Sequence, residues 1–86
     1  GLIEDPATRC DLRGARADDA LSQLEGFLDQ SYNKGAREIT VIHGHGTGAL
    51  KRAVRESLEI SPYVQGFRPG ERHEGGDGVT VVHLDS

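Results

Sequence analysis

Three glycines, at positions 44, 46 and 48, stand between an apolar run and a segment with helical spacing. The run at residues 39–42, Ile-Thr-Val-Ile, is typical of a buried strand. After the glycines, Leu50, Val54 and Leu58 recur at four-residue steps, which predicts a helix. A glycine turn between a strand and a helix leaves backbone N–H groups unpaired where the helix dipole attracts anions. The stretch from His43 to Gly48 therefore predicts an α/β chain path and a phosphate site.

The same periodicities extend the prediction along the chain. Strands are expected at 9–12, 38–43, 64–68 and 79–84, where residues alternate in polarity or are β-branched. One helix should begin at Asp18 or Asp19 and end before a left-handed Gly35, and the second should stop at Ser61-Pro62. The order β-α-β-α-β-β implies parallel first strands and a closing antiparallel pair. We expect a two-layer α/β sandwich, a mixed four-stranded sheet with both helices on one face.

Side-chain spacing predicts which residues pack between the layers. Cys10 and Leu12 should face the core, while Asp11 and Arg13 face the other way. The polar, glycine-rich segment 71–78 is expected to be a flexible connection. The core faces of the two helices are predicted to be Ala17, Ala20, Leu21, Leu24, Phe27, Leu28, Ser31 and Tyr32, and Leu50, Ala53, Val54 and Leu58.

Composition restricts the class of protein. The 86 residues suffice for one small domain, placed at 9–86, and residues 1–8 are interpreted as the end of a linker. One cysteine excludes an internal disulfide and is compatible with a reducing, cytoplasmic location. No apolar run approaches the length of a membrane span, so we expect no membrane partner. The formal net charge of −4 argues against strong, non-specific binding of nucleic acid.

Residues around the glycine turn are candidates for phosphate binding. Thr47 could cap the second helix and also meet a phosphate, and His45 is more suited to substrate contact than to catalysis. His43, at the strand end, could move a proton, or could be a partly buried histidine bonded to a loop carbonyl. The basic residues of the second helix, Lys51, Arg52 and Arg55, could form a positive patch or be ordinary solvated charges. Gly44, Gly46 and Gly48 complete the candidate phosphate site.

Asp11 and Arg13 end the first strand and should lie at the same sheet edge as His43. Asp11 could ligate a divalent metal ion, Mg²⁺ or Mn²⁺, or orient a water for attack on phosphorus. Its alternative role is a surface carboxylate paired with Arg13. Arg13 could clamp a phosphate through two N–H donors, or form only an exposed salt bridge. The glycine spacing matches neither a P-loop nor the dinucleotide-binding fingerprint.

Three motifs together resemble the small MutS-related (Smr) domain. They are Cys10-Asp11-Leu12-Arg13-Gly14, His43-Gly44-His45-Gly46-Thr47-Gly48 and residues 75–82, Gly-Gly-Asp-Gly-Val-Thr-Val-Val. The chain is most similar to the version at the C-terminus of the bacterial MutS paralogue that acts outside mismatch repair. The family's first motif is commonly Leu-Asp-Leu-His-Gly. Arg13 replaces its histidine, as the paralogue often does, which removes one candidate general base.

The resemblance implies a fold like the C-terminal domain of translation initiation factor three and a nucleic-acid-binding, nicking endonuclease. Asp11, Arg13 and His43 would be its catalytic residues. It also implies a larger MutS-like ATPase parent, homodimeric through other domains, that acts in recombination control. DNA or RNA is the expected partner. The alternative is a non-catalytic module that binds DNA, RNA or the ribosome in ribosome rescue. Only Asp11 is an obviously placed acid, which argues for weak metal binding or a metal-independent reaction.

Overall fold

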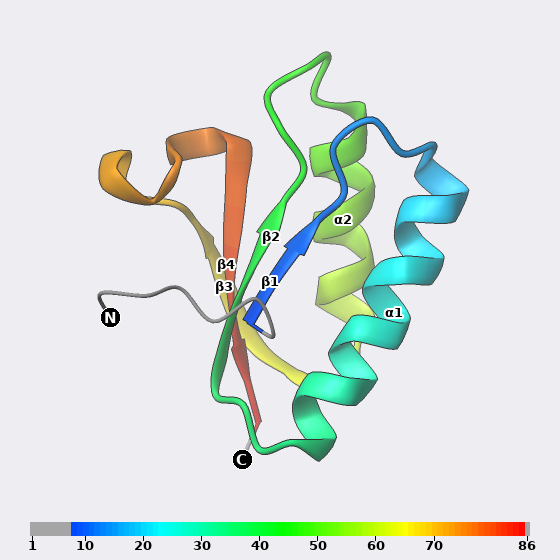
Figure 1. The fold of residues 1–86 in the computed structure, drawn as a ribbon, viewed down its shortest axis with the longest axis vertical. Coiled ribbons are helices and arrows are strands. Elements are labelled where there is room, and N and C mark those ends of the chain that lie inside the picture. Colours follow the sequence, from blue (N-terminus) through cyan, green and yellow to red (C-terminus); the bar gives the residue numbers. More distant parts are fainter. Residues whose placement is uncertain (1–7, 86) are drawn as a thin grey trace.

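Strands and helices alternate along the chain in the expected order (Figure 1). The structure is a computed structural model that describes residues 8–85. The linker end expected at 1–8 falls outside these residues except for Thr8, so that boundary stays a prediction. The elements are β1 (Arg9–Asp11), α1 (Ala17–Asn33), β2 (Glu38–Ile42), α2 (Ala49–Ile60), β3 (Val64–Pro69) and β4 (Val79–Leu84).

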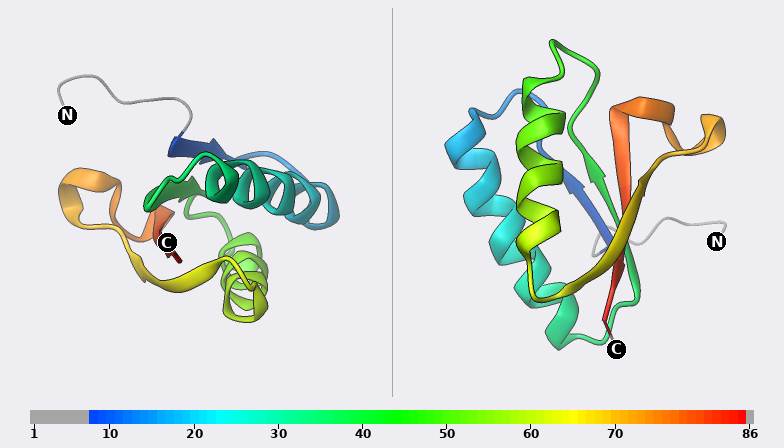
Figure 2. Two further views of the ribbon diagram at one scale, coloured as in Figure 1. Left: turned by 90° about the horizontal axis from the view of Figure 1, so that it is seen from below. Right: turned by 180° about the vertical axis from the view of Figure 1, so that it is seen from behind.

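The four strands form one mixed sheet in the order β1-β2-β4-β3. β1 pairs with β2 in parallel, and β4 runs antiparallel to both of its neighbours, β2 and β3. Both helices lie against one face of this sheet (Figure 2). The apolar residues of β4 fall on both faces of the strand, and Val81 and Val82 are fully buried, as a central strand requires. The predicted two-layer sandwich is confirmed.

The core fills the space between the sheet and the helices. Cys10 and Leu12 are buried and Asp11 and Arg13 are exposed, so the predicted alternation of β1 is confirmed. Ile39 and Val41 of β2 face the same core. The cluster consists of Cys10, Leu12, Ala20, Leu24, Leu28, Ile39, Val41, Val54, Leu58, Val82 and Leu84. Its residues are aliphatic apart from one cysteine, and they hold α1 and α2 in place.

The ends of α1 depart from the predicted core face. Ala17 is exposed because the helix begins there, and Tyr32 is 40% exposed beside Tyr63, with ring centroids 4.9 Å apart. The N-cap is Arg16, which makes no side-chain cap. Asp18 instead accepts a hydrogen bond from the first-turn amide of Asp19, at 3.0 Å.

The C-terminal signals of both helices hold. Gly35 has a φ of 79°, the left-handed conformation expected after α1. α2 ends at Ile60, before Ser61-Pro62. Within residues 8–85, neither helix combines the length and apolarity that crossing a bilayer requires.

The connection between β3 and β4, expected to be flexible, is folded. It contains two short 3₁₀ helices, η2 (Arg72–Glu74) and η3 (Gly76–Gly78). Glu74 accepts hydrogen bonds from Arg68 of β3 at 2.8 and 3.2 Å and from the Glu71 amide at 2.7 Å. The connection is held in place by Arg68 of β3, a partner outside it that the local composition does not reveal. The fold of this connection brings η3 beside the glycine turn.

Truncation of Leu58 should test the assigned core face of α2. Leu58 is 1% exposed, so Leu58→Ala should lower the free energy of unfolding by about 2–5 kcal/mol. Ile60, on the same helix, is 84% exposed, and Ile60→Ala should change it by about 0.5 kcal/mol or less. Urea denaturation followed by circular dichroism measures both. Equal losses in the two variants would contradict the assigned face.

Candidate functional site

The glycine turn between β2 and α2 has a backbone path that glycine alone adopts readily. Gly44, Gly46 and Gly48 have φ angles of 80°, 38° and 86°, all in the left-handed region. The amides of His43 and Gly44 both donate to the carbonyl oxygen of Gly78, at 3.2 and 2.9 Å. The predicted glycine conformations are confirmed, and the turn is anchored to the start of β4.

Several amides of this turn are available to a ligand. In the described part of the chain, the N–H groups of His45, Gly46 and Thr47 donate no hydrogen bond. The Thr47 hydroxyl accepts from the Ala49 amide at 3.3 Å, so it caps α2 as expected although Gly48 holds the N-cap position. Unpaired amides at a helix N-terminus suit an anion.

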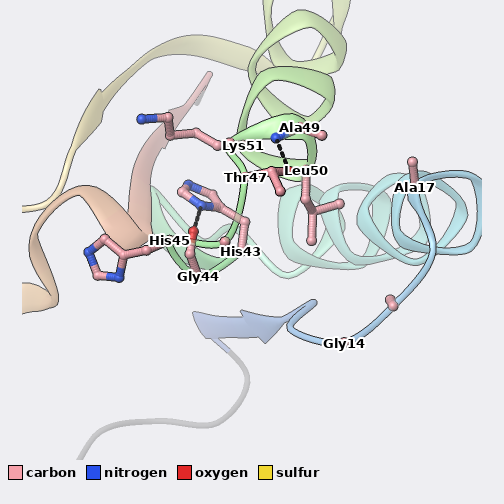
Figure 3. Close-up of a pocket in the computed structure, with 12 residues that line it drawn as sticks. Gly14, Ala17, His43, Gly44, His45, Thr47, Ala49, Leu50 and Lys51 are labelled. Atoms are coloured by element: carbon pink, nitrogen blue, oxygen red, sulfur yellow. Dashed lines mark hydrogen bonds between the residues drawn. The ribbon is translucent and has the colours of Figure 1, made fainter.

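A hollow of about 310 Å³ separates this turn from the loop that precedes α1 (Figure 3). The loop contributes Gly14 and Ala15, the start of α1 contributes Ala17, and the other wall consists of residues 43–51. The residues that carry the free turn amides, together with His43 and Lys51, therefore line one opening. The parallel strands β1 and β2 end at this edge, so the structure places the opening where the sequence predicted the site.

His43 is 5% exposed, and both of its ring nitrogens have partners. Nδ1 lies 3.0 Å from the carbonyl oxygen of Gly44, which can only accept, so Nδ1 carries the proton. Nε2 then accepts from the Thr80 hydroxyl, 2.8 Å away. Burial holds the pKa of His43 below its usual value, and the positive charges of Arg55 and Lys51 lower it further. These bonds match the alternative role that the sequence left open, a buried histidine bonded to a loop carbonyl.

His45 is the exposed histidine of the turn, and its ring points away from that of His43 (Figure 3). The ring packs against Gly78, where an added Cβ would lie 2.8 Å from Cε1. It borders the hollow described above and a second one, of about 200 Å³, that also touches Arg13 and Ile42. This position suits the substrate contact predicted for His45.

Asp11 and Arg13 form a two-point ion pair. Nε and Nη2 of Arg13 donate to the two carboxylate oxygens of Asp11 at 2.9 and 2.7 Å, and the Arg13 amide donates at 3.1 Å. The Arg13 side-chain bonds are the main reason that the pKa of Asp11 falls to about 2. The stem of Arg13 crosses Gly44, where an added Cβ would lie 3.3 Å from Arg13 Cγ. The structure thus brings Arg13 to the turn.

Asp11 and His43 lie on opposite faces of the sheet. Asp11 pairs in register with Ile42, and His43 follows Ile42 by one residue, so their side chains alternate to different sides. The three residues predicted to be catalytic therefore form a pair, Asp11 with Arg13, and a separate buried histidine.

The positive patch expected on α2 is partly neutralised by ion pairs. Lys51 and Arg55 both pair with Asp77 of η3, at 2.5 and 3.5 Å, whereas Arg52 is exposed and makes no ion pair within residues 8–85. Among the four site cations, Arg13 also has a carboxylate partner, so two acids offset half of their charge. Sequence reasoning missed Asp77, although it lies within the third motif.

The described residues do not form a chelating set for a divalent ion. In residues 8–85, no three side chains of His, Cys, Asp or Glu are grouped closely enough to hold a metal. Both oxygens of Asp11 bond to Arg13. Asp11 as a metal ligand stays a prediction from the sequence.

Comparison with known proteins identifies the family of this chain. A family model described as the Smr domain matches residues 10–85. Endonuclease MutS2 of Anaeromyxobacter sp. is 55% identical over 76 residues, which are 88% of this chain and 9% of that protein. Endonuclease MutS2 of Caldanaerobacter subterraneus is 47% identical over 76 residues, 88% of this chain and 10% of that protein. The chain spans about a tenth of the length of these relatives.

Solved structures share the fold. The crystal structure of the Smr domain of Thermus thermophilus MutS2 matches with a TM-score of 0.90 at 38% identity, covering 92% of this chain and 99% of that one. YdaL, a stand-alone small MutS-related protein from Escherichia coli, also reaches 0.90, at 22% identity, covering 95% of this chain and 67% of that one. At that identity, YdaL supports the fold alone.

Removal of Arg13 should raise the pKa of Asp11. Carboxyl-detected NMR should give about 2 in the wild type, and Arg13→Ala should shift the pKa toward the ordinary 3.8. Because the folded pKa lies below the unfolded one, the pair stabilises the fold above about pH 4, and this stability is lost as the pH falls toward 2. Arg16→Ala removes a neighbouring charge without touching Asp11 and should leave the pKa unchanged. An unchanged pKa in Arg13→Ala would contradict the ion pair.

His43 should stay neutral at and below the pH where ordinary histidines titrate. Long-range ¹⁵N spectra should show the Nδ1–H tautomer. The unfolded chain gains a proton near pH 6.5 that folded His43 resists, so stability should fall as the pH drops below about 6.5. His43→Gln should flatten this dependence, whereas His73→Asn, at an exposed site, should preserve it. A wild-type His43 that titrates at 6.5 or above would show that the buried hydrogen bonds are absent in solution.

Proposed function

The chain belongs to the Smr domain family, and on that premise we propose that it is a nucleic-acid-binding endonuclease domain that nicks the phosphodiester backbone. The observation that carries the proposal is the row of three unpaired amides in the glycine turn, with Arg13 folded across Gly44. Relatives with about half of their aligned residues identical carry the name Endonuclease MutS2, which supports the reaction class.

Arg13 and the turn would hold the phosphate that is attacked. A guanidinium has five N–H donors, and Asp11 uses two of those in Arg13. The remaining donors face solvent on a side chain that is 63% exposed. A phosphate bound there would meet a donor group whose orientation is already set, which lowers the entropy lost on binding.

Asp11 would act chiefly by orienting Arg13. With a pKa of about 2 it is a carboxylate at neutral pH and a weak proton acceptor. Water would attack phosphorus as the bond to the leaving oxygen breaks, with one water proton passing through solvent to that oxygen, and the charge that develops on the phosphate would be stabilised by Arg13 and the amides. His43 could move a proton only after releasing Thr80 or Gly44. The described residues contain no group of three side chains that fits a divalent ion, so Arg13 and the turn amides are the groups proposed to act on the phosphate.

The alternative function is a non-catalytic module that grips DNA, RNA or the ribosome. It is favoured by the occupied nitrogens of His43, because binding needs cations and amides but no proton transfer. For the whole protein we propose a cytoplasmic, MutS-like ATPase, homodimeric through other domains, that acts in recombination control. Ribosome rescue is the role that accompanies the alternative.

A nicking assay on supercoiled plasmid and structured RNA, with and without Mg²⁺ or Mn²⁺, tests the proposal. Asp11→Ala should abolish cleavage and lower affinity much less than Arg13→Ala does, because the guanidinium and the turn amides remain while the orientation of Arg13 is lost. Arg13→Ala should weaken binding on the order of tenfold and lower the salt slope by about one. Arg16→Ala is the matched control. Wild type that binds in an Arg13-dependent way yet cuts nothing would refute the nuclease and leave the binding module.

A further inference from the structure

Asp77 sits between two cations of α2. Its Oδ2 lies 2.5 Å from Nζ of Lys51, and its Oδ1 lies 3.5 Å from Nη2 of Arg55. The two cations are one helical turn apart, so one carboxylate bridges them with one oxygen for each. We call Lys51, Arg55 and Asp77 the Asp77 notch.

We propose that Asp77 is a specificity-determining residue that occupies, on Lys51 and Arg55, the place of a backbone phosphate, so that a bound strand must displace it. This inference rests on the proposed binding of nucleic acid. A carboxylate and a phosphodiester both present anionic oxygens that accept hydrogen bonds from Lys and Arg. Lys51 is one of the residues that line the hollow, and its side chain extends from α2 on the same side as the two histidine rings (Figure 3). A strand held by the turn would therefore lie near the notch.

The Asp77 carboxylate leaves one donor of the notch, Nη2 of Arg55, without a hydrogen bond. Nη2 of Arg55 is buried, and in the described part of the chain no acceptor is in hydrogen-bond geometry with it. Asp77 Oδ1, at 3.5 Å, is near enough for ion pairing but makes no hydrogen bond there. A buried donor without an acceptor is costly, and a phosphate oxygen could supply the missing bond.

Asp77 can leave the notch without unfolding its surroundings. Its side chain is 58% exposed, while those of Lys51 and Arg55 are 28% and 27% exposed. The adjacent Gly78 carbonyl holds the amides of His43 and Gly44, so the backbone beside Asp77 is fixed independently of its carboxylate. Rotation of one short side chain would expose both cations.

The consequence is discrimination against loosely held strands. With Asp77 in place, Arg52 is the one α2 cation within residues 8–85 that makes no ion pair. A strand that is attracted by charge alone gains little binding free energy from Lys51 and Arg55, because Asp77 already neutralises them. A phosphate that is also bound by the turn amides competes with Asp77 for both cations and can add its missing hydrogen bond.

The test compares Asp77→Asn with Glu59→Gln, an equal charge change at the far end of α2. Fluorescence anisotropy with a labelled DNA hairpin of mixed sequence measures affinity at several salt concentrations. Asp77→Asn should bind on the order of tenfold more tightly at low salt, with a salt slope steeper by about one to two. Glu59→Gln should gain much less. Equal gains in the two variants would show a net-charge effect and overturn the inference.

Lys51→Ala, made in the wild type and in Asp77→Asn, provides a second readout. It tests whether Asp77 already neutralises Lys51 in the unbound protein. Where Asp77 is present the substitution should cost little affinity, because Lys51 loses an anionic partner in both states, Asp77 in the free state and phosphate in the bound state. In the Asp77→Asn background it should cost several-fold more, because there only the bound state provides an anion. Additive losses would overturn the inference, provided that the melting temperatures show both variants folded.

Inorganic phosphate separates this inference from the proposed function. In NMR titrations, it should shift the Lys51 and Arg55 side-chain signals in Asp77→Asn and much less in the wild type. If no variant binds the hairpin but phosphate still distinguishes Asp77→Asn from the wild type, the proposed nucleic-acid binding is refuted and the role of Asp77 as an occupant of the phosphate position is supported. If the wild type binds the hairpin through Arg13, and Asp77→Asn binds both hairpin and phosphate as the wild type does, the proposed function is supported and the inference about Asp77 is refuted.

Discussion

The carbonyl oxygen of Gly78 accepts hydrogen bonds from two consecutive amides, those of His43 and Gly44, and the arrangement of the site depends on this contact. These bonds join the end of β2 to the start of β4 and so fix the direction in which the glycine turn leaves the sheet. The absence of side chains at both glycines matters as well, because Arg13 crosses Gly44 and the His45 ring packs on Gly78. A side chain at position 78 would clash with that ring, and one at 44 would crowd Arg13.

The charges of the site are arranged as internal pairs. Arg13 is paired with Asp11 at the end of β1, and Lys51 and Arg55 share Asp77 from η3. In each pair the carboxylate is about half exposed, so water screens the attraction and the pairs contribute little to stability. Their effect is instead on geometry and selectivity: Asp11 orients a guanidinium, and Asp77 covers two cations. This internal neutralisation fits a chain whose formal net charge is −4 and whose proposed ligand is itself an anion.

The two histidines of the turn have different surroundings although one residue separates them. His43 continues the alternation of β2 into the helix-facing side, where Thr80 and the Gly44 carbonyl bind its ring. His45 has left the strand and lies exposed beside both hollows. The inner ring links the turn to β4, and the outer ring is placed to meet a ligand. Burial lowers the pKa of the inner one, which keeps it uncharged at neutral pH.

The sequence alone determined the order of the strands and helices, the layer arrangement and the left-handed glycines, because these follow from local periodicity and local backbone preference. It also indicated that Asp11 and Arg13 share a face, since alternation along a strand is a local property. Tertiary structure alone decided the partners: Thr80 for His43, 37 residues away, and Asp77 for Lys51, 26 residues away. It also ordered the β3–β4 connection through Arg68 and exposed the ends of α1. A periodic pattern specifies which face a residue occupies, whereas its contact across the fold depends on how distant segments pack.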